Sequence, residues 1–152
     1  MKNIDNKTVE GFGDEWSRFD QTGMSEQEAK KVFEEYFSIF PWNDLPNNAE
    51  GFDMGCGSGR WARFVAPMVG VLHCIEPSNA IIVVKKNLSK FNNVNYYRAS
   101  ADDNVLPLNS QDFGYSLGVL HHVPDTQSAI TSCVSFLKPG APLLLYLYYA
   151  FD

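Results

Sequence analysis

The glycine-rich segment at residues 51–60, GFDMGCGSGR, constrains the fold of this chain more than any other stretch. We expect a short strand at 52–54, a loop with glycine at 55, 57 and 59, and a helix over 60–66. Glycine tolerates positive φ and lets a ligand lie against bare backbone. The unpaired N–H groups of a helix that begins here would favour a carboxylate or a phosphate. The segment therefore predicts an anion-binding turn at the end of a strand.

The spacing of this loop differs from the known phosphate-binding motifs. Gly55 and Gly57 fit the dinucleotide fingerprint G-x-G-x-x-G, but its third glycine position holds Arg60. No Lys-Ser or Lys-Thr pair follows, so the G-x-x-x-x-G-K-[ST] motif is absent. Asp53 would repel a pyrophosphate and suits a ligand with positive charge. A purely structural turn is the alternative interpretation.

The apolar segment 71–76, VLHCIE, has the length of a strand and ends in Glu76, about 20 residues after the first glycine of the loop. In nucleotide-binding folds an acid at this place accepts hydrogen bonds from ribose hydroxyls. One carboxylate can accept from both hydroxyls of a ribose. The alternative is a solvated strand end, but the spacing to the glycine loop favours the ribose role.

Together, DMGCGSGR at 53–60 and IEPS at 75–78 resemble the class I S-adenosylmethionine-dependent methyltransferases. Within that superfamily the chain is most similar to the small-molecule branch related to the ubiquinone-biosynthesis methyltransferases, over about residues 49–145. The resemblance implies S-adenosyl-L-methionine as the cofactor and a small molecule as the methyl acceptor. It implies cofactor contacts at the glycine loop and the ribose acid: Asp53, Gly55, Cys56, Gly57, Gly59, Glu76 and Pro77.

Residues 99–103, ASADD, match the turn that holds the adenine in the resembling family. The match implies a backbone N–H of Ala101 facing a ring nitrogen. It also implies an acid near the exocyclic amine, which is either Asp102 or Asp103. The family often has an acid where this chain has Ser100.

Residues 117–125, LGVLHHVPD, resemble the family segment that borders the methionine moiety and the acceptor. The cofactor contacts implied here are Leu117, Gly118 and Val119. His121 and His122 are candidates for a catalytic base because histidine titrates near neutral pH. The alternative is a structural pair, with one ring packed and the other near the acceptor pocket.

Strands and helices alternate after residue 71: helices at about 77–90 and 124–137, and strands at 94–99, 113–119 and 142–149. This alternation predicts an α/β fold with a parallel sheet, right-handed crossovers and a ligand site at the carboxyl ends of the strands. The resemblance implies a Rossmann-like doubly wound sheet of five parallel strands in the order 3-2-1-4-5, with helices on both faces. In the resembling family an acid usually follows the phenylalanine that starts the fourth strand. This chain has Gly114 there, and we expect it to weaken strand packing.

We expect a single methyltransferase domain over residues 1–152, with an N-terminal helical cover at 1–46 and a cofactor-binding core at 47–152. Residues 1–24 read as polar and irregular. Their aromatic residues Phe12, Trp16 and Phe19, at helical spacing, form either a turn packed on the core or a lid. A capping box at 25–28, SEQE, predicts a helix to about residue 40. Its apolar stripe is interpreted as core: Ala29, Val32, Phe33, Tyr36, Phe37 and Phe40.

The last predicted strand is apolar on both faces, as in a fully buried parallel strand. At a sheet edge it would expose unpaired backbone and apolar side chains. Family members with this pattern usually continue with further C-terminal strands. We therefore expect a truncated piece of a longer chain, with a complete cofactor half and an incomplete acceptor pocket, or a homodimer that covers the strand.

The formal net charge of −6 and the pI near 5.0 argue against general affinity for nucleic acid or an anionic membrane. No stretch is typical of a signal peptide or a membrane span. The cysteines, Cys56, Cys74 and Cys133, are far apart and form no C-x-x-C motif. They predict neither a zinc site nor a disulfide framework, and we expect a reduced, cytoplasmic location.

Two other functions remain as alternatives. A nicotinamide-dependent oxidoreductase shares the strand, glycine loop and ribose acid, although Arg60 and Asp53 count against it. The second alternative is a catalytically silent domain of the same fold. Such a domain binds the cofactor or has lost it, and serves as an interaction module. No residue identifies the nucleophile that would accept the methyl group.

Overall fold

A five-stranded parallel sheet forms the centre of the computed structural model, which describes residues 3–18 and 24–148 except the side chains of Phe12 and residues 14–18. The strands lie in the order β3-β2-β1-β4-β5. Their bounds are β1 (Glu50–Met54), β2 (Val71–Ile75), β3 (Val94–Tyr97), β4 (Phe113–Leu117) and β5 (Leu143–Tyr146). The predicted α/β fold and the predicted strand order are confirmed.

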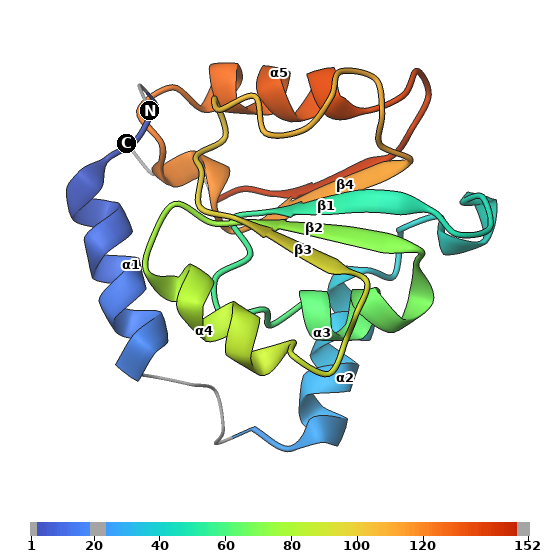
Figure 1. Ribbon diagram of the computed structural model, residues 1–152, viewed down its shortest axis with the longest axis horizontal. Coiled ribbons are helices and arrows are strands. Elements are labelled where there is room, and N and C mark those ends of the chain that lie inside the picture. The colour runs from blue at the N-terminus through green and yellow to red at the C-terminus, as the bar shows by residue number, and fades with distance from the viewer. Residues whose placement is uncertain (1–2, 19–23, 149–152) are drawn as a thin grey trace.

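Helices cover both faces of this sheet (Figure 1). On one face lies α5 (Thr126–Phe136), and on the other lie α2 (Glu26–Tyr36), α3 (Ala62–Val65) and α4 (Ala80–Asn87). The first helix, α1 (Asn6–Arg18), stands beside the sheet and packs against α4. Short 3-10 turns complete the elements: η1 (Trp42–Asp44), η2 (Ala66–Met68) and η3 (Leu120–His122).

The N-terminal segment differs from its sequence prediction, because α1 occupies residues expected to be irregular. Asp5 caps this helix: its Oδ1 accepts hydrogen bonds from the backbone N–H groups of Lys7 and Thr8, at 3.1 and 3.5 Å. The aromatic cluster predicted at Phe12, Trp16 and Phe19 lies outside the described side chains.

Two other predicted helices are shorter in the structure. The predicted capping box opens α2, with Ser25 and Glu28 exchanging both hydrogen bonds at 3.2 Å, but the helix ends at Tyr36. The helix after the glycine loop spans only Ala62–Val65 and continues as the turn η2, where Pro67 has no N–H to donate.

Glycine and phenylalanine alternate between the two central strands. The register pairs Gly51 with Phe113 and Phe52 with Gly114. A Cβ atom on Gly114 would lie 2.3 Å from the ring of Phe52, and one on Gly51 would lie 2.3 Å from the ring of Phe113. Both rings are fully buried. The expectation that Gly114 weakens strand packing is wrong, since its missing side chain is the space that Phe52 fills.

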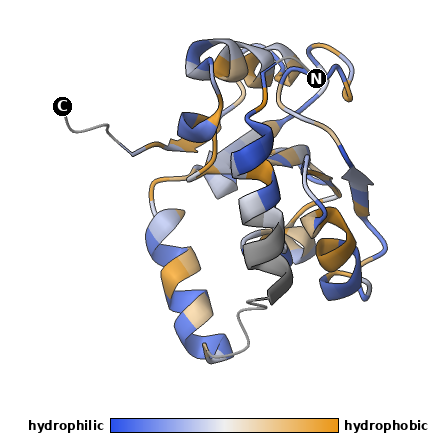
Figure 2. Ribbon diagram, turned by 90° about the vertical axis from the view of Figure 1, so that its left-hand side faces the viewer, coloured by the Kyte–Doolittle hydropathy of each residue, from blue (hydrophilic) through white to orange (hydrophobic). Residues whose placement is uncertain are grey.

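Each face of the sheet carries its own hydrophobic core. Under α2, α3 and α4 the core includes Phe33, Phe37, Val84, Leu88 and Tyr115, among others. Under α5 it includes Phe52, Ile75, Cys133 and Phe136. Seen from the side of α1, the helices in front carry hydrophilic and hydrophobic residues along the same helix, as expected for helices that cover a core (Figure 2).

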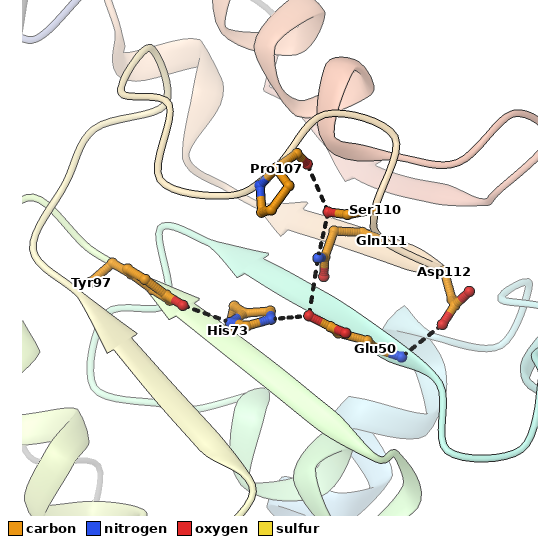
Figure 3. Close-up of polar contacts among 7 residues, drawn as sticks. All are labelled: Glu50, His73, Tyr97, Pro107, Ser110, Gln111 and Asp112. Carbon is orange, nitrogen blue, oxygen red and sulfur yellow. Dashed lines mark hydrogen bonds and ion pairs between the residues drawn. The ribbon is translucent and has the colours of Figure 1, made fainter.

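A polar network ties the start of β1 to β2, β3 and the loop before β4 (Figure 3). Glu50 Oε1 lies 2.7 Å from His73 Nε2, and His73 Nδ1 lies 3.0 Å from the Tyr97 hydroxyl. Because an ionised carboxylate only accepts, His73 donates to Glu50 from Nε2, and Nδ1 of a neutral ring then accepts from the Tyr97 hydroxyl. The hydrogen bond from His73 lowers the pKa of Glu50. Gln111 Nε2 also donates to Glu50, at 3.3 Å, which anchors the loop that leads back from the site.

Candidate functional site

A cavity of about 240 Å³ lies where the strands end. All five strands or the loops that follow them contribute to its wall, as expected for a ligand site in an open parallel sheet. The N-terminal segment also contributes to the wall, with Asn3, Ile4, Asp5, Thr8 and Val9. Most of the residues predicted from the sequence line it: Gly55, Cys56, Gly57, Glu76, Pro77, Ala101, Leu117, Gly118, Val119 and His122.

The glycine loop adopts the backbone that its composition predicts, with φ of 79° at Gly55, 55° at Gly57 and 87° at Gly59. The N–H groups of Gly55 and Cys56 both donate to the carbonyl oxygen of Ile75, at 2.8 and 3.1 Å. Gly59 does not line the cavity. A Cβ atom there would lie 2.9 Å from Val84, so this glycine allows the loop to pack on α4.

Glu76 joins this loop to the turn before α4. Its Oε2 accepts from the N–H of Gly57 and its Oε1 accepts from the N–H of Ser78, each at 3.0 Å. The side chain is 7% exposed and lines the cavity. Each oxygen keeps a second lone pair, so the carboxylate can still accept from hydroxyl groups of a ligand.

Asp53 lies behind the cavity rather than in its wall. Its carboxyl is 1% exposed, and its Oδ2 has no hydrogen-bond partner among the described residues. Burial raises the pKa of Asp53 to about 8, and the nearby charge of Glu76 adds to the shift. At neutral pH this carboxyl is therefore mostly protonated, and it offers no full negative charge to a ligand.

The turn after β3 brings Ser100 and Ala101 to the cavity, whereas Asp102 and Asp103 do not line it. Asp103 Oδ2 accepts from the backbone N–H of Ser100 at 2.9 Å, and Asp102 Oδ1 accepts from the Ser100 hydroxyl. Asp102 Oδ2 accepts from the backbone N–H of Asn3 at 3.1 Å. Both candidate acids thus accept from Ser100, and Asp102 is the one that also holds the N-terminal segment.

Asn3 fastens the N-terminal segment at a second loop as well. Its Nδ2 donates to the carbonyl of Asp125 at 2.7 Å, and its Oδ1 accepts from the N–H of Asp125 at 2.8 Å. These contacts join residues about 100 or more positions apart in the chain. They fix the start of the N-terminal segment, of which Asn3, Ile4, Asp5, Thr8 and Val9 line the cavity.

The two adjacent histidines differ in their surroundings. His122 lines the cavity, whereas both ring nitrogens of His121 are buried without a hydrogen-bond partner among the described residues. The ring of His121 lies 4.0 Å from that of His122 and 4.8 Å from that of Tyr148, centroid to centroid. Burial, together with His122, lowers the pKa of His121. Of the pair, only His122 is placed to meet a ligand.

Aromatic side chains and one cation form a part of the wall that the sequence analysis did not identify: Tyr36, Arg60, Trp61, Tyr146 and Tyr148. The Tyr36 ring lies 5.0 Å from that of Trp61 and 5.2 Å from that of Tyr146. Tyr36 belongs to the α2 stripe interpreted as core. The sequence held no signal for this, because the helix was predicted to continue to about residue 40, whereas it ends at Tyr36.

Comparison with known proteins gives a consistent assignment. The family described as a methyltransferase domain matches residues 52–145. Ubiquinone biosynthesis O-methyltransferase of Coxiella burnetii is 30% identical over 93 residues, which is 60% of this chain and 40% of that protein. Phosphoethanolamine N-methyltransferase 2 of Caenorhabditis elegans is 33% identical over 100 residues, 63% of this chain and 23% of that protein. The chain therefore spans less than half the length of these relatives.

A solved structure shares the fold over most of the chain. The crystal structure of a SAM dependent methyltransferase from Aquifex aeolicus superposes with a TM-score of 0.64 at 17% identity, covering 84% of this chain and 68% of that one. At this identity the likeness concerns the fold alone. No helix in residues 3–18 or 24–148 has the length and apolar character needed to cross a membrane.

Proposed function

This chain belongs to the methyltransferase domain family, and on that premise we propose that it binds S-adenosylmethionine in the cavity and transfers the methyl group to a small-molecule acceptor. The observation that carries the proposal is Glu76, a buried carboxylate in the cavity wall that is oriented by the N–H groups of Gly57 and Ser78. A fixed acceptor of this kind suits the paired hydroxyls of a ribose.

The other residues of the wall fit the rest of the cofactor. We place the amino-acid part of the cofactor between two segments of the wall. One is the loop at Gly55, Cys56 and Gly57, whose two glycines have no side chain, and the other is Leu117, Gly118 and Val119. We assign the adenine to Ser100 and Ala101, which line the cavity. Asp102, next to them in the chain but outside the cavity wall, is the acid that we assign to its exocyclic amine. Asp53 and Gly59 support the loop from behind rather than touching the ligand.

The bound cofactor supplies an activated methyl group on a sulfonium, so the protein contributes mainly alignment of the acceptor and exclusion of water. His122 is the residue of the pair that we assign to the acceptor side, where it could take a proton from a hydroxyl or an amine. His121 would support its ring by packing.

We assign residues 3–9 as a cover over the bound cofactor. The cavity of about 240 Å³ is smaller than the roughly 300–1,000 Å³ of small-molecule sites. Admission of a cofactor would therefore move this segment outward, and release of the Asn3 contacts would also remove the hydrogen bond from Asn3 to Asp102 Oδ2.

Transfer of labelled methyl groups tests the activity. The protein is incubated with methyl-labelled S-adenosylmethionine and a panel of phenols, amines and carboxylic acids, and label in each acceptor is counted. Label in one chemical class supports the proposal. Cofactor binding with no labelled product across the panel would favour the catalytically silent alternative.

A further inference from the structure

Resting on the proposed function, we propose that Arg60 forms a carboxylate-binding subsite in the cavity. Arg60 follows the glycine loop directly and lines the cavity wall. Its Cζ lies 4.4 Å from the centroid of the Trp61 ring, a cation–π contact that holds the planar guanidinium in place. Trp61 is itself 9% exposed and packed in the core. The guanidinium therefore packs on a ring that is itself fixed in the core.

Arg60 forms no ion pair with the carboxylates that the structure describes. The ion pairs within the described part of the chain involve other basic groups: Lys30, Arg63, His73 and Lys138. The two carboxylates of the cavity wall have partners elsewhere. Glu76 accepts from the backbone of Gly57 and Ser78, and Asp5 accepts from the backbone of Lys7 and Thr8 at the start of α1. The fork of N–H donors on Arg60 thus suits a ligand carboxylate.

The backbone N–H groups of Gly55, Cys56 and Gly57 in the glycine loop are already hydrogen-bonded, so an anion in the cavity would need a side-chain donor. The sequence predicted that N–H groups of the glycine loop would hold an anion, but those of Gly55 and Cys56 donate to Ile75, and that of Gly57 donates to Glu76. The helix that follows begins only at Ala62 and has four residues, so its dipole is weak. Arg60 is the cation of the described cavity wall that can replace these donors.

Two sources of a carboxylate would reach this subsite. One is the amino-acid part of the cofactor. The other is an acceptor that carries a carboxylate and packs against the aromatic rings of Tyr36 and Tyr146 on the same wall. The chemistry at Arg60 is the same in both cases, and ligands that lack the amino-acid part separate them.

The first arm compares S-adenosylhomocysteine with 5′-methylthioadenosine, which lacks the carboxylate, by calorimetry on wild type and Arg60→Gln. If the cofactor supplies the carboxylate, the substitution weakens the binding of S-adenosylhomocysteine by about 10- to 100-fold. The affinity for methylthioadenosine then stays within about twofold of the wild-type value. The matched control is Arg63→Gln, which removes the same charge from a side chain paired with Glu26 outside the cavity and should change neither affinity.

The second arm titrates benzoate into the complex with S-adenosylhomocysteine. If the acceptor supplies the carboxylate, both nucleoside affinities survive in Arg60→Gln, and benzoate binds the wild-type complex but not the variant complex. Either pattern supports the subsite. The proposal would be overturned if Arg60→Gln lowered the affinity for both nucleosides equally. It would also be overturned if nucleoside binding were unchanged and benzoate binding did not depend on Arg60. Failure of folded wild type to bind S-adenosylhomocysteine would overturn the proposed function instead.

Discussion

Glu76 holds the glycine loop from the neighbouring strand, because its Oε2 accepts a hydrogen bond of 3.0 Å from the N–H of Gly57. The two residues lie 19 positions apart in the chain, and the bond is buried. The same carboxylate therefore shapes the loop and faces the cavity, so its removal should affect both.

Replacing Glu76 with alanine should weaken S-adenosylhomocysteine binding by about 1.5–3 kcal/mol, since hydrogen bonds to a charged group are lost. The change is measured by calorimetry at a temperature where both proteins are folded. Glu35→Ala, on an exposed position of α2, is the control and should bind like wild type. Wild-type affinity in Glu76→Ala would place the ribose elsewhere.

Replacing Gly114 with alanine should lower the free energy of unfolding by about 1–3 kcal/mol, as overpacking of a core does. The new methyl group would lie 2.3 Å from the ring of Phe52, which is fully buried and packs against Phe136 of α5. Chemical denaturation measures the loss. Gly11→Ala in α1, with nothing within 4 Å of the new atom, should be neutral or slightly stabilising. Equal effects of the two changes would contradict the packing account.

Replacing Asp53 with asparagine should flatten the pH dependence of stability. The folded pKa of about 8 lies above the ordinary value of 3.8, so the folded state binds the extra proton. This contribution is fully present below about pH 4 and is lost as the pH rises towards 8. One proton gives a slope of at most ~1.4 kcal/mol per pH unit.

Asparagine does not titrate, so the free energy of unfolding of Asp53→Asn should increase relative to that of wild type as the pH rises. The free energy of unfolding of both proteins is measured by urea denaturation from pH 5 to pH 8.5. Parallel curves across this range would show that Asp53 is ionised in the folded protein.

Replacing Asn3 with alanine should speed the dissociation of S-adenosylhomocysteine by about 5- to 30-fold, because two hydrogen bonds of the cover to Asp125 are lost. Stopped-flow displacement measures the rate. Asn92→Ala, on an exposed loop, serves as the control. An unchanged rate in Asn3→Ala would indicate that residues 3–9 do not gate the cavity.

Local pattern was enough to predict a parallel sheet with a site at its strand ends, and the family resemblance supplied the strand order and most of the individual contacts. The alternation of apolar runs with turn signals predicted the strands. The spacing from Gly55 to Glu76 predicted a shared site, and both residues line one cavity. Strand ends of a parallel sheet meet at one edge, so residues that follow strands converge without knowledge of long-range contacts.

The rest of the site depends on contacts between distant segments. Asn3 meets Asp102 and Asp125, and Tyr36 meets Tyr146, only because α1 and α2 pack where they do. Gly114 could be read only as a weak strand former, because the ring of Phe52 that fills its place comes from another strand. Asp53 looked like a charged ligand contact because its burial cannot be seen in the sequence.

Calorimetric titration of the folded wild-type chain with S-adenosylhomocysteine tests the central claim most directly, with NADH titrated in parallel and followed by its fluorescence. We expect saturable binding of S-adenosylhomocysteine at one site per chain and no binding of NADH. Binding of NADH alone would favour the oxidoreductase alternative. Absence of S-adenosylhomocysteine binding in protein shown to be folded by circular dichroism would contradict the account.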